Sequence, residues 1–209
     1  MKVIIFGATG SIGKHLVQQS LSLGHVTTVF VRNPEKLGDV RHANLNIFRG
    51  DVFDRAAVEQ AIKGHDAVLC ALGDGATGRV RSEGTRNIVD AMEKVGVKRL
   101  ICQSTLGAGD SRGNLNFFWK HIMFGILLKK ALRDHEVQEK AVMESDLDWT
   151  VVRPAAFTDG GITHQYKHGF APTDRSTTLK ISRADVAAFM LKQLASDQYL
   201  RKTPGLAYA

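Results

Sequence analysis

The sequence predicts one α/β domain in which a doubly wound parallel sheet is covered by helices on both faces. Short apolar runs rich in β-branched residues alternate along the chain with amphipathic helical segments. Such runs are typical of strands buried on both sides, and the alternation is typical of a parallel sheet. The 209 residues, of which 44% are hydrophobic and 23% charged, suit a single globular domain. We therefore assign residues 1–209 to one domain.

The first strand–turn–helix unit gives the main indication of function in the sequence. Residues 3–6 form an apolar run that predicts a buried strand, and residues 14–23 predict an amphipathic helix. Gly7, Gly10 and Gly13 lie between them with the spacing G-x-x-G-x-x-G. Glycine lets the backbone turn sharply and approach a pyrophosphate, which the N–H groups of the new helix can bind. A plain tight turn would also favour glycine, but this spacing in the first unit favours a dinucleotide-binding loop.

The other elements follow in order. We expect strands at 25–31, 45–48, 67–72, 97–103 and 148–152, and helices at 55–63, 82–95 and 186–196, the last opened by a capping-box pattern at 182–185. Two segments, 114–133 after the fifth strand and 155–178 after the sixth, interrupt the alternation. Because ligands bind beyond the carboxyl ends of parallel strands, we expect both segments to border the substrate site. We call residues 114–133 the lid segment.

Composition and charge narrow the function further. No apolar run approaches the ~20 residues of a membrane span, and the chain opens with a strand instead of a signal peptide, so we expect a cytoplasmic protein. The net charge of +7 is scattered, which favours an anionic cofactor and substrate over nucleic acid. Cys70 and Cys102 are expected to be buried free thiols, and no histidine spacing fits a metal. A membrane-touching helix is the alternative to a lid over the site for 114–133.

Basic residues follow the second strand, where an NAD-binding fold carries a carboxylate for the ribose 2′-OH. Arg32 and Lys36 favour a 2′-phosphate there, hence NADP(H), over a solvated basic loop. Asp51, after the third strand, can accept from the adenine amino group with Val52 against the ring, or can be an ordinary turn residue. Gly73 ends the fourth strand and allows the backbone to approach the cofactor.

Ser104 ends the fifth strand and is the candidate catalytic or cofactor-orienting residue, because that strand is expected to end near the nicotinamide. Serine also ends strands for no chemical reason, so that alternative stays open. No Gly-x-Ser-x-Gly motif is present and Ser104 has no evident His/Asp partners, which excludes a standard hydrolase.

Taken together, these motifs resemble those of the NmrA-like atypical short-chain dehydrogenases, and within that group the biliverdin-IXβ/flavin reductases. The resemblance spans nearly the whole chain and is loosest over 108–133 and 158–179. It rests on Phe-Gly-Ala-Thr-Gly at 6–10, Val-Arg at 31–32, Gly-Asp-Val at 50–52, Ser-Glu-Gly-Thr-Arg-Asn-Ile at 82–88, Ser104, Val-Arg-Pro at 152–154 and Ile-Ser-Arg-Ala-Asp-Val at 181–186.

The resemblance implies a set of cofactor-binding residues. By resemblance, the pyrophosphate is held by Gly7, Thr9, Gly10, Ser11, Ile12 and Gly13, and the 2′-phosphate by Arg32 and Lys36. The adenine meets Asp51 and Val52, the nicotinamide ribose and ring are flanked by Leu72, Gly73 and Ser104, and Pro154, Ala155, Ala156 and Phe157 form the wall beside the nicotinamide.

The chain departs from two related patterns. The Tyr-x-x-x-Lys motif of standard short-chain dehydrogenases is absent: Glu136 stands four residues before Lys140, and none of the tyrosines has such a lysine. The biliverdin/flavin reductases also lack that tyrosine. Where the mammalian-type enzyme carries a histidine, this chain has Ala156.

The resemblance implies an NADPH-dependent reductase of planar, conjugated, anionic acceptors such as FMN or biliverdin-like tetrapyrroles. An NADP(H)-binding regulatory or redox-sensor protein with little turnover, and an NADPH quinone reductase, are the alternatives. Phe117, Phe118 and Trp119 offer ring faces to an acceptor, although a core position suits them as well. Arg112, Lys120, Lys129 and Arg133 are expected to offer charge to its phosphate or propionate groups outside the cleft. We expect a monomer, with neither nucleic acid nor membrane as partner.

Overall fold

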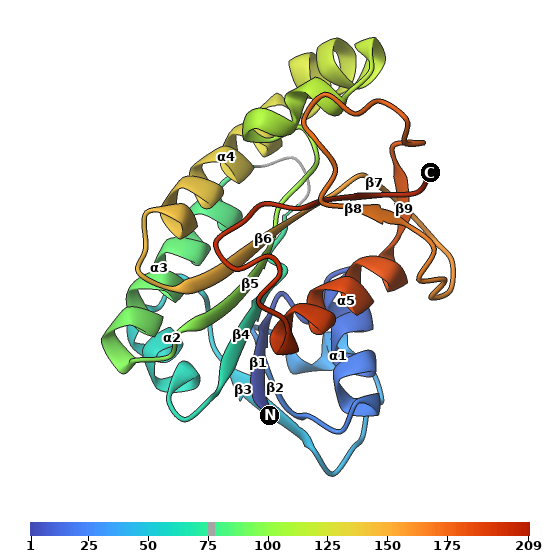
Figure 1. Cartoon of the computed structure of the whole chain (residues 1–209). Helices are drawn as coiled ribbons and strands as arrows, with labels where there is room; N and C mark the ends of the chain where they lie inside the picture. The colour runs from blue at the N-terminus through green and yellow to red at the C-terminus, as the bar shows by residue number, and fades with distance from the viewer. Residues whose placement is uncertain (75–77) are drawn as a thin grey trace.

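An eight-stranded sheet organises the computed structural model, which describes residues 1–74 and 78–209 (Figure 1). Its order is β3 (Leu45–Arg49), β2 (Val26–Val31), β1 (Lys2–Phe6), β4 (Ala67–Cys70), β5 (Arg99–Gln103), β6 (Asp148–Pro154), β10 (Gly205–Ala207) and β8 (Lys167–His168). Only β10 and β8 pair antiparallel. The chain reverses its direction of travel across the sheet between β1 and β4, which is where ligands bind in doubly wound folds. The predicted fold is confirmed.

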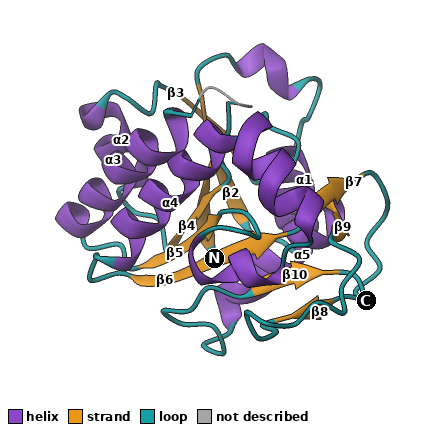
Figure 2. Ribbon diagram, turned by 90° about the horizontal axis from the view of Figure 1, so that it is seen from above, coloured by secondary structure: helices purple, strands orange, loops and turns teal. Residues whose placement is uncertain are grey.

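The sheet separates two apolar cores. On one face, Val3 and Ile5 of β1 pack under α1 (Gly13–Ser22) and α5 (Arg183–Lys192). On the other, Ile4 and Phe6 pack under α2 (Arg55–Ile62), α3 (Val80–Val95) and α4 (Lys129–Met143). Figure 2 shows the sheet between these two layers of helices. Burial on both faces explains the unbroken apolar sequence of the central strands.

Cys70 and Cys102 lie side by side in β4 and β5, where they are register partners. Both are buried free thiols, as predicted. No helix of the described residues is long and apolar enough to cross a membrane.

The region after β5 differs most from the prediction. The lid segment contains the end of a 3₁₀-helix, η2 (Gly109–Asn114), then a π-helix, η3 (Phe118–Leu127), and the start of α4. The sequence did not predict α4 beyond residue 133, because several of its buried positions are polar, among them Asp134, Gln138 and Glu139. Hydrophobic periodicity cannot reveal a helix whose inward face carries a hydrogen-bonded polar network.

Short elements complete the domain. A second, two-stranded sheet pairs β7 (Ala156–Thr158) with β9 (Lys180–Ser182), and a 3₁₀-helix, η1 (Pro34–Leu37), follows β2. The last helix begins at Arg183, earlier than predicted, and gives way to η4 (Gln193–Ala195). Its capping box is confirmed: the backbone N–H of Asp185 donates to Ser182 Oγ at 3.0 Å.

Candidate active site

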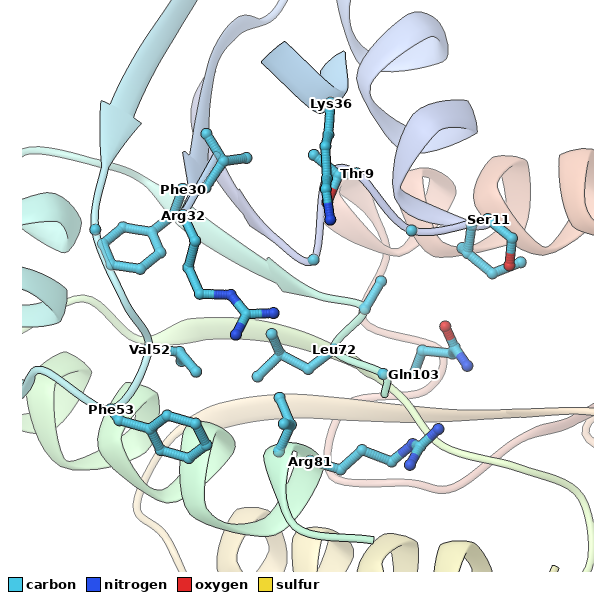
Figure 3. Close-up of a pocket in the computed structure, with 18 of the residues that line it drawn as sticks. Thr9, Ser11, Phe30, Arg32, Lys36, Val52, Phe53, Leu72, Arg81 and Gln103 are labelled. Carbon is cyan, nitrogen blue, oxygen red and sulfur yellow. The ribbon is translucent and has the colours of Figure 1, made fainter. Parts of the chain in front are cut away.

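A cleft of about 490 Å³ opens at the carboxyl ends of β1, β2, β4 and β5, at the point where the chain reverses its direction of travel across the sheet (Figure 3). We call it the switch-point cleft. It brings together most of the predicted cofactor residues. These are Gly7, Thr9, Gly10, Ser11, Ile12, Arg32, Lys36, Val52, Leu72, Gly73 and Phe157.

The three glycines of the first turn act in different ways. Gly7 has a φ of +82°, and a Cβ there would lie 2.2 Å from the Ala71 carbonyl oxygen, so only glycine fits. A Cβ on Gly13 would lie 2.0 Å from the Gly7 carbonyl oxygen. Gly13 therefore lets α1 sit close against the turn and does not itself line the cleft. Gly10 does line it, and its missing side chain leaves the backbone open to a ligand.

The start of α1 fits an anion. Its N-cap residue, Ile12, makes no side-chain capping hydrogen bond, and the first turn has no acidic residue. The N–H groups and the positive dipole end at this terminus are thus available to a pyrophosphate at the turn.

Arg32 and Lys36 reach into the cleft from the end of β2 and from η1 (Figure 3). Asn33 caps η1 by accepting from the Glu35 backbone N–H at 3.1 Å, which sets Lys36 one turn beyond Arg32. None of the described lining residues is a carboxylate. Two cations without a competing acid fit the 2′-phosphate of NADP(H).

The remaining predicted residues lie elsewhere. Asp51 Oδ1 accepts from the Phe53 backbone N–H at 3.0 Å, so this side chain forms a turn and Val52 alone lines the cleft. Pro154 is buried in β6, where its carbonyl accepts from Leu106 N–H at 2.8 Å. Ser104 is fully buried, lines neither this cleft nor the cavity beside it, and its Oγ has no hydrogen-bond partner among the described residues. The catalytic role of Ser104 stays a prediction.

A second cavity, of about 370 Å³, adjoins the cleft, and both are lined by Arg81 and Phe157. We call it the adjoining cavity. Its walls come from the two segments predicted to border the substrate site. Leu115, Trp119, Phe124 and Leu128 come from the lid segment, and Ala155, Ala156 and Phe157 follow β6. This mostly apolar space beside the cleft has the character of a small-molecule site.

The lid segment contributes only part of the expected aromatic surface to the adjoining cavity. Phe117 and Phe118 are 75% and 54% exposed, and only Trp119 of the three aromatic residues lines the adjoining cavity. The four cations expected to supply charge outside the cleft do not line this cavity, and their role stays a prediction. Its cations are instead Arg81 and Arg183, which the sequence analysis did not single out as site residues. The one signal in the sequence that could have indicated them is their position, because each lies near the start of a helix that follows a strand.

Helix α4 directs two residues to the site that the sequence motifs did not mark. Ala131 and His135, four residues apart, line the adjoining cavity. Glu136 and Lys140 lie on the exposed face, where Lys140 Nζ is 3.7 Å from Glu144 Oε1. Glu136 and Lys140 therefore do not occupy the place of a Tyr-x-x-x-Lys pair beside the cavity.

His135 is buried within a hydrogen-bonded chain. Its Nδ1 lies 3.1 Å from Gln138 Oε1, and Gln138 Nε2 donates to Thr85 Oγ1 at 3.0 Å. Because the Gln138 oxygen accepts, Nδ1 carries the proton and Nε2 is left as an acceptor. Burial, reinforced by the Arg81 cation, lowers the pKa of His135 to about 4. The ring is neutral at pH 7 and is a poor proton donor.

Arg81 stands between the two spaces and is held by carboxylates. Its Nη1 lies 3.0 Å from Asp74 Oδ1 and 3.6 Å from Asp134 Oδ2. Asp134 also accepts from the backbone N–H groups of Arg81 and Ser82, at 3.2 and 3.0 Å. The same carboxylate therefore fixes Arg81 and joins α4 to the start of α3.

Comparison with known proteins agrees with this geometry. Residues 7–197 match a family of NAD(P)H-binding proteins. The photosystem II assembly factor Ycf39 of Synechocystis is 26% identical over 97% of this chain, which spans 61% of the length of Ycf39.

Two solved structures share the fold. ChuY, an anaerobilin reductase of Escherichia coli O157:H7, has a TM-score of 0.83 and 23% identity, covering 99% of this chain and 97% of ChuY. A short-chain dehydrogenase/reductase of Veillonella parvula in complex with NADP has a TM-score of 0.80 and 19% identity, covering 99% and 94% of the two chains. With the family match over most of its length, the chain belongs to the NAD(P)H-binding Rossmann family, in the NmrA-like atypical short-chain dehydrogenase group that its motifs resemble.

Proposed function

We propose that the protein is an NADPH-dependent reductase of planar, conjugated, anionic acceptors such as flavins or linear tetrapyrroles. The observation that carries this proposal is the adjoining cavity itself. It is apolar, contains the ring of Trp119 and two arginines, and meets the switch-point cleft at Phe157 and Arg81. An acceptor there would lie beside the end of the cleft assigned to the nicotinamide.

The residues of the cleft suit the groups of NADPH. The turn at 7–13 and the start of α1 would hold the pyrophosphate, and Arg32 and Lys36 would hold the 2′-phosphate. When bound, NADPH supplies the hydride. The chain would contribute position: Leu72, Gly73 and Phe157 line the cleft and would hold the nicotinamide beside the acceptor.

The chain also contributes electrostatics. An acceptor gains negative charge as it is reduced, and the Arg81 and Arg183 cations in the adjoining cavity would stabilise that charge. The described lining residues of this cavity include no carboxylic acid and no tyrosine. With His135 neutral, the proton that completes the reduction would come from solvent.

The comparisons support this proposal and also a second candidate function. ChuY, which has the same fold, is an anaerobilin reductase, and this favours a conjugated tetrapyrrole-like acceptor. Ycf39 is an assembly factor, and this favours the second candidate, an NADP(H)-binding regulatory protein with little turnover.

The two candidates are separated by a turnover assay. Purified protein is mixed with NADPH and with FMN, biliverdin, riboflavin or a quinone, and the loss of nicotinamide absorbance is followed. We expect turnover with FMN or biliverdin, at a higher rate than with uncharged acceptors. Tight NADPH binding without turnover of any acceptor would contradict the reductase and favour the regulatory protein.

A further inference from the structure

Arg183, the first residue of α5, has a guanidinium that the protein uses only in part. Its Nη1 lies 2.6 Å from Asp159 Oδ1, and its Cζ lies 5.6 Å from the centre of the Phe157 ring. Its Nε is buried and has no hydrogen-bond partner among the described residues. A guanidinium has five N–H donors in a fixed planar arrangement. In Arg183 the Nε–H donor is therefore left without an acceptor among the described residues. Arg183 also lines the adjoining cavity, so this side chain lies at the site.

The existing partner of Arg183 is easily exchanged. The Asp159 side chain is 98% exposed, whereas that of Arg183 is 25% exposed. An ion pair with so exposed a carboxylate contributes little, because water solvates the acid as well as the arginine does. A ligand carboxylate or phosphate that reaches Arg183 from within the cavity can form a bidentate pair in a less hydrated setting.

The other cation of the cavity is committed elsewhere. Arg81 is paired with Asp74 and with the buried Asp134. The start of α5 already has a cap and a negative charge of its own, because the Asp185 backbone N–H donates to Ser182 Oγ at 3.0 Å and the Asp185 carboxylate lies in the first turn. The anion-binding capacity at this edge of the cavity therefore belongs to the side chain of Arg183.

The Phe157 ring sets the geometry of a ligand. Phe157 lines both the cleft and the adjoining cavity, and Arg183 lies over its face. A conjugated acceptor packed against Phe157 would place a short anionic arm within reach of the guanidinium.

We propose that Arg183 is the anion anchor of the acceptor site. It binds the carboxylate or phosphate carried on the side arm of a planar conjugated substrate, and Asp159 is the counter-ion that this group displaces. The assignment rests on the proposed reductase function, because the ligand it anchors is the acceptor of that reaction.

The test compares acceptors that differ only in the anionic arm. With saturating NADPH, KM and kcat are measured for FMN against riboflavin, and for biliverdin against its dimethyl ester. The first pair tests phosphate recognition and the second carboxylate recognition. For Arg183→Met we expect KM for the charged member of the recognised pair to rise on the order of tenfold or more. KM for the uncharged member should change by less than about twofold, because it makes no ion pair.

Three further variants sharpen the result. Arg183→Lys keeps the charge and should recover part of the lost affinity. Asp159→Asn removes the competing carboxylate and should lower KM for the charged acceptor. Arg175→Met is the matched control, because Arg175 is exposed, donates to the Gly113 carbonyl at 3.3 Å and does not line the cavity. It should change neither member of a pair. Thermal unfolding and NADPH affinity of every variant check the fold.

The opposite results overturn the assignment. Equal rises in KM for charged and uncharged acceptors in Arg183→Met would mark a structural residue, and a raised KM in Asp159→Asn would contradict the displacement. Failure of the reductase function looks different, since wild type would then turn over no acceptor. In that event FMN binding to the NADP⁺-loaded protein, followed by flavin fluorescence, decides: equal Kd values for wild type and Arg183→Met overturn the anchor.

Discussion

We propose that two side chains that follow β2 set the choice of cofactor. Arg32 and Lys36 line the cleft without an acidic neighbour among the described lining residues. Arg32→Ala should weaken NADPH binding by ~1.5–3 kcal/mol, the usual size of a hydrogen bond to a charged group, and leave NADH binding little changed. Titration of both nucleotides measures the difference. Arg41→Ala, an exposed arginine outside the cleft, is the control. Equal wild-type affinity for NADH and NADPH would refute the 2′-phosphate assignment.

Ser104 poses a second question at the residue scale. Its hydroxyl is buried without a partner among the described residues, which is costly unless a ligand or water completes it. If it orients the cofactor, Ser104→Ala should reduce turnover by about tenfold, well short of the loss of a nucleophile. If it merely ends a strand, the same change should leave turnover intact and should not lower the melting temperature. NADPH oxidation and thermal unfolding of one variant distinguish the two.

At the scale of elements, α4 determines which groups can donate a proton. Its exposed face carries Glu136, and Tyr166 lies in a separate cavity between α1 and α5. Glu136→Gln and Tyr166→Phe should each retain most of the wild-type turnover, because neither side chain lines the adjoining cavity. Rates measured between pH 6 and 9 check this. A collapse of activity in either variant would reveal a side-chain acid that the geometry does not place there.

The elements also explain what could be predicted from the sequence. The parallel strands and the first turn are local patterns: apolar runs buried on both faces, and glycines such as Gly7 whose conformation no other residue fits. Helix α4 could not be predicted from hydrophobic periodicity because its inward face is polar. Strands β7 to β10 could not be predicted because two or three residues are too few to show an alternating pattern. Arg81 and Arg183 acquire their place only when distant segments meet around one cavity, which no local pattern encodes.

At the scale of the whole molecule, one buried polar layer joins the helices to the sheet. Glu139 of α4 forms a 2.7 Å ion pair with Arg153 of β6, and Asp134 holds the start of α3. His135 lies between them in sequence and faces the cavity that the two layers enclose. His135, which faces the adjoining cavity, thus also couples the global stability of the protein to pH.

The buried histidine predicts the form of that coupling. The pKa of His135 falls from 6.5 to about 4 because burial and the Arg81 cation disfavour its charged form, although Asp134 and Asp74 oppose the shift. The unfolded chain therefore binds a proton more readily than the folded one. The stabilisation is complete above pH 6.5 and is lost as the pH falls toward 4, at about 1.4 kcal/mol per pH unit and roughly 3 kcal/mol in total.

Denaturant unfolding of wild type and His135→Gln at pH 7.5, 6.5, 5.5 and 5 measures this contribution. Glutamine does not titrate but can still donate to Gln138, so the stability of the variant should fall less steeply between pH 6.5 and 5, by about 2 kcal/mol over that interval. His42→Gln, at an exposed position, should follow the wild-type curve. Parallel curves for wild type and His135→Gln would mean that His135 titrates alike in the folded and unfolded chain. The imidazole beside Arg81 would then be charged below about pH 6.5, and a proton source for the reduced acceptor would exist within the adjoining cavity at that pH.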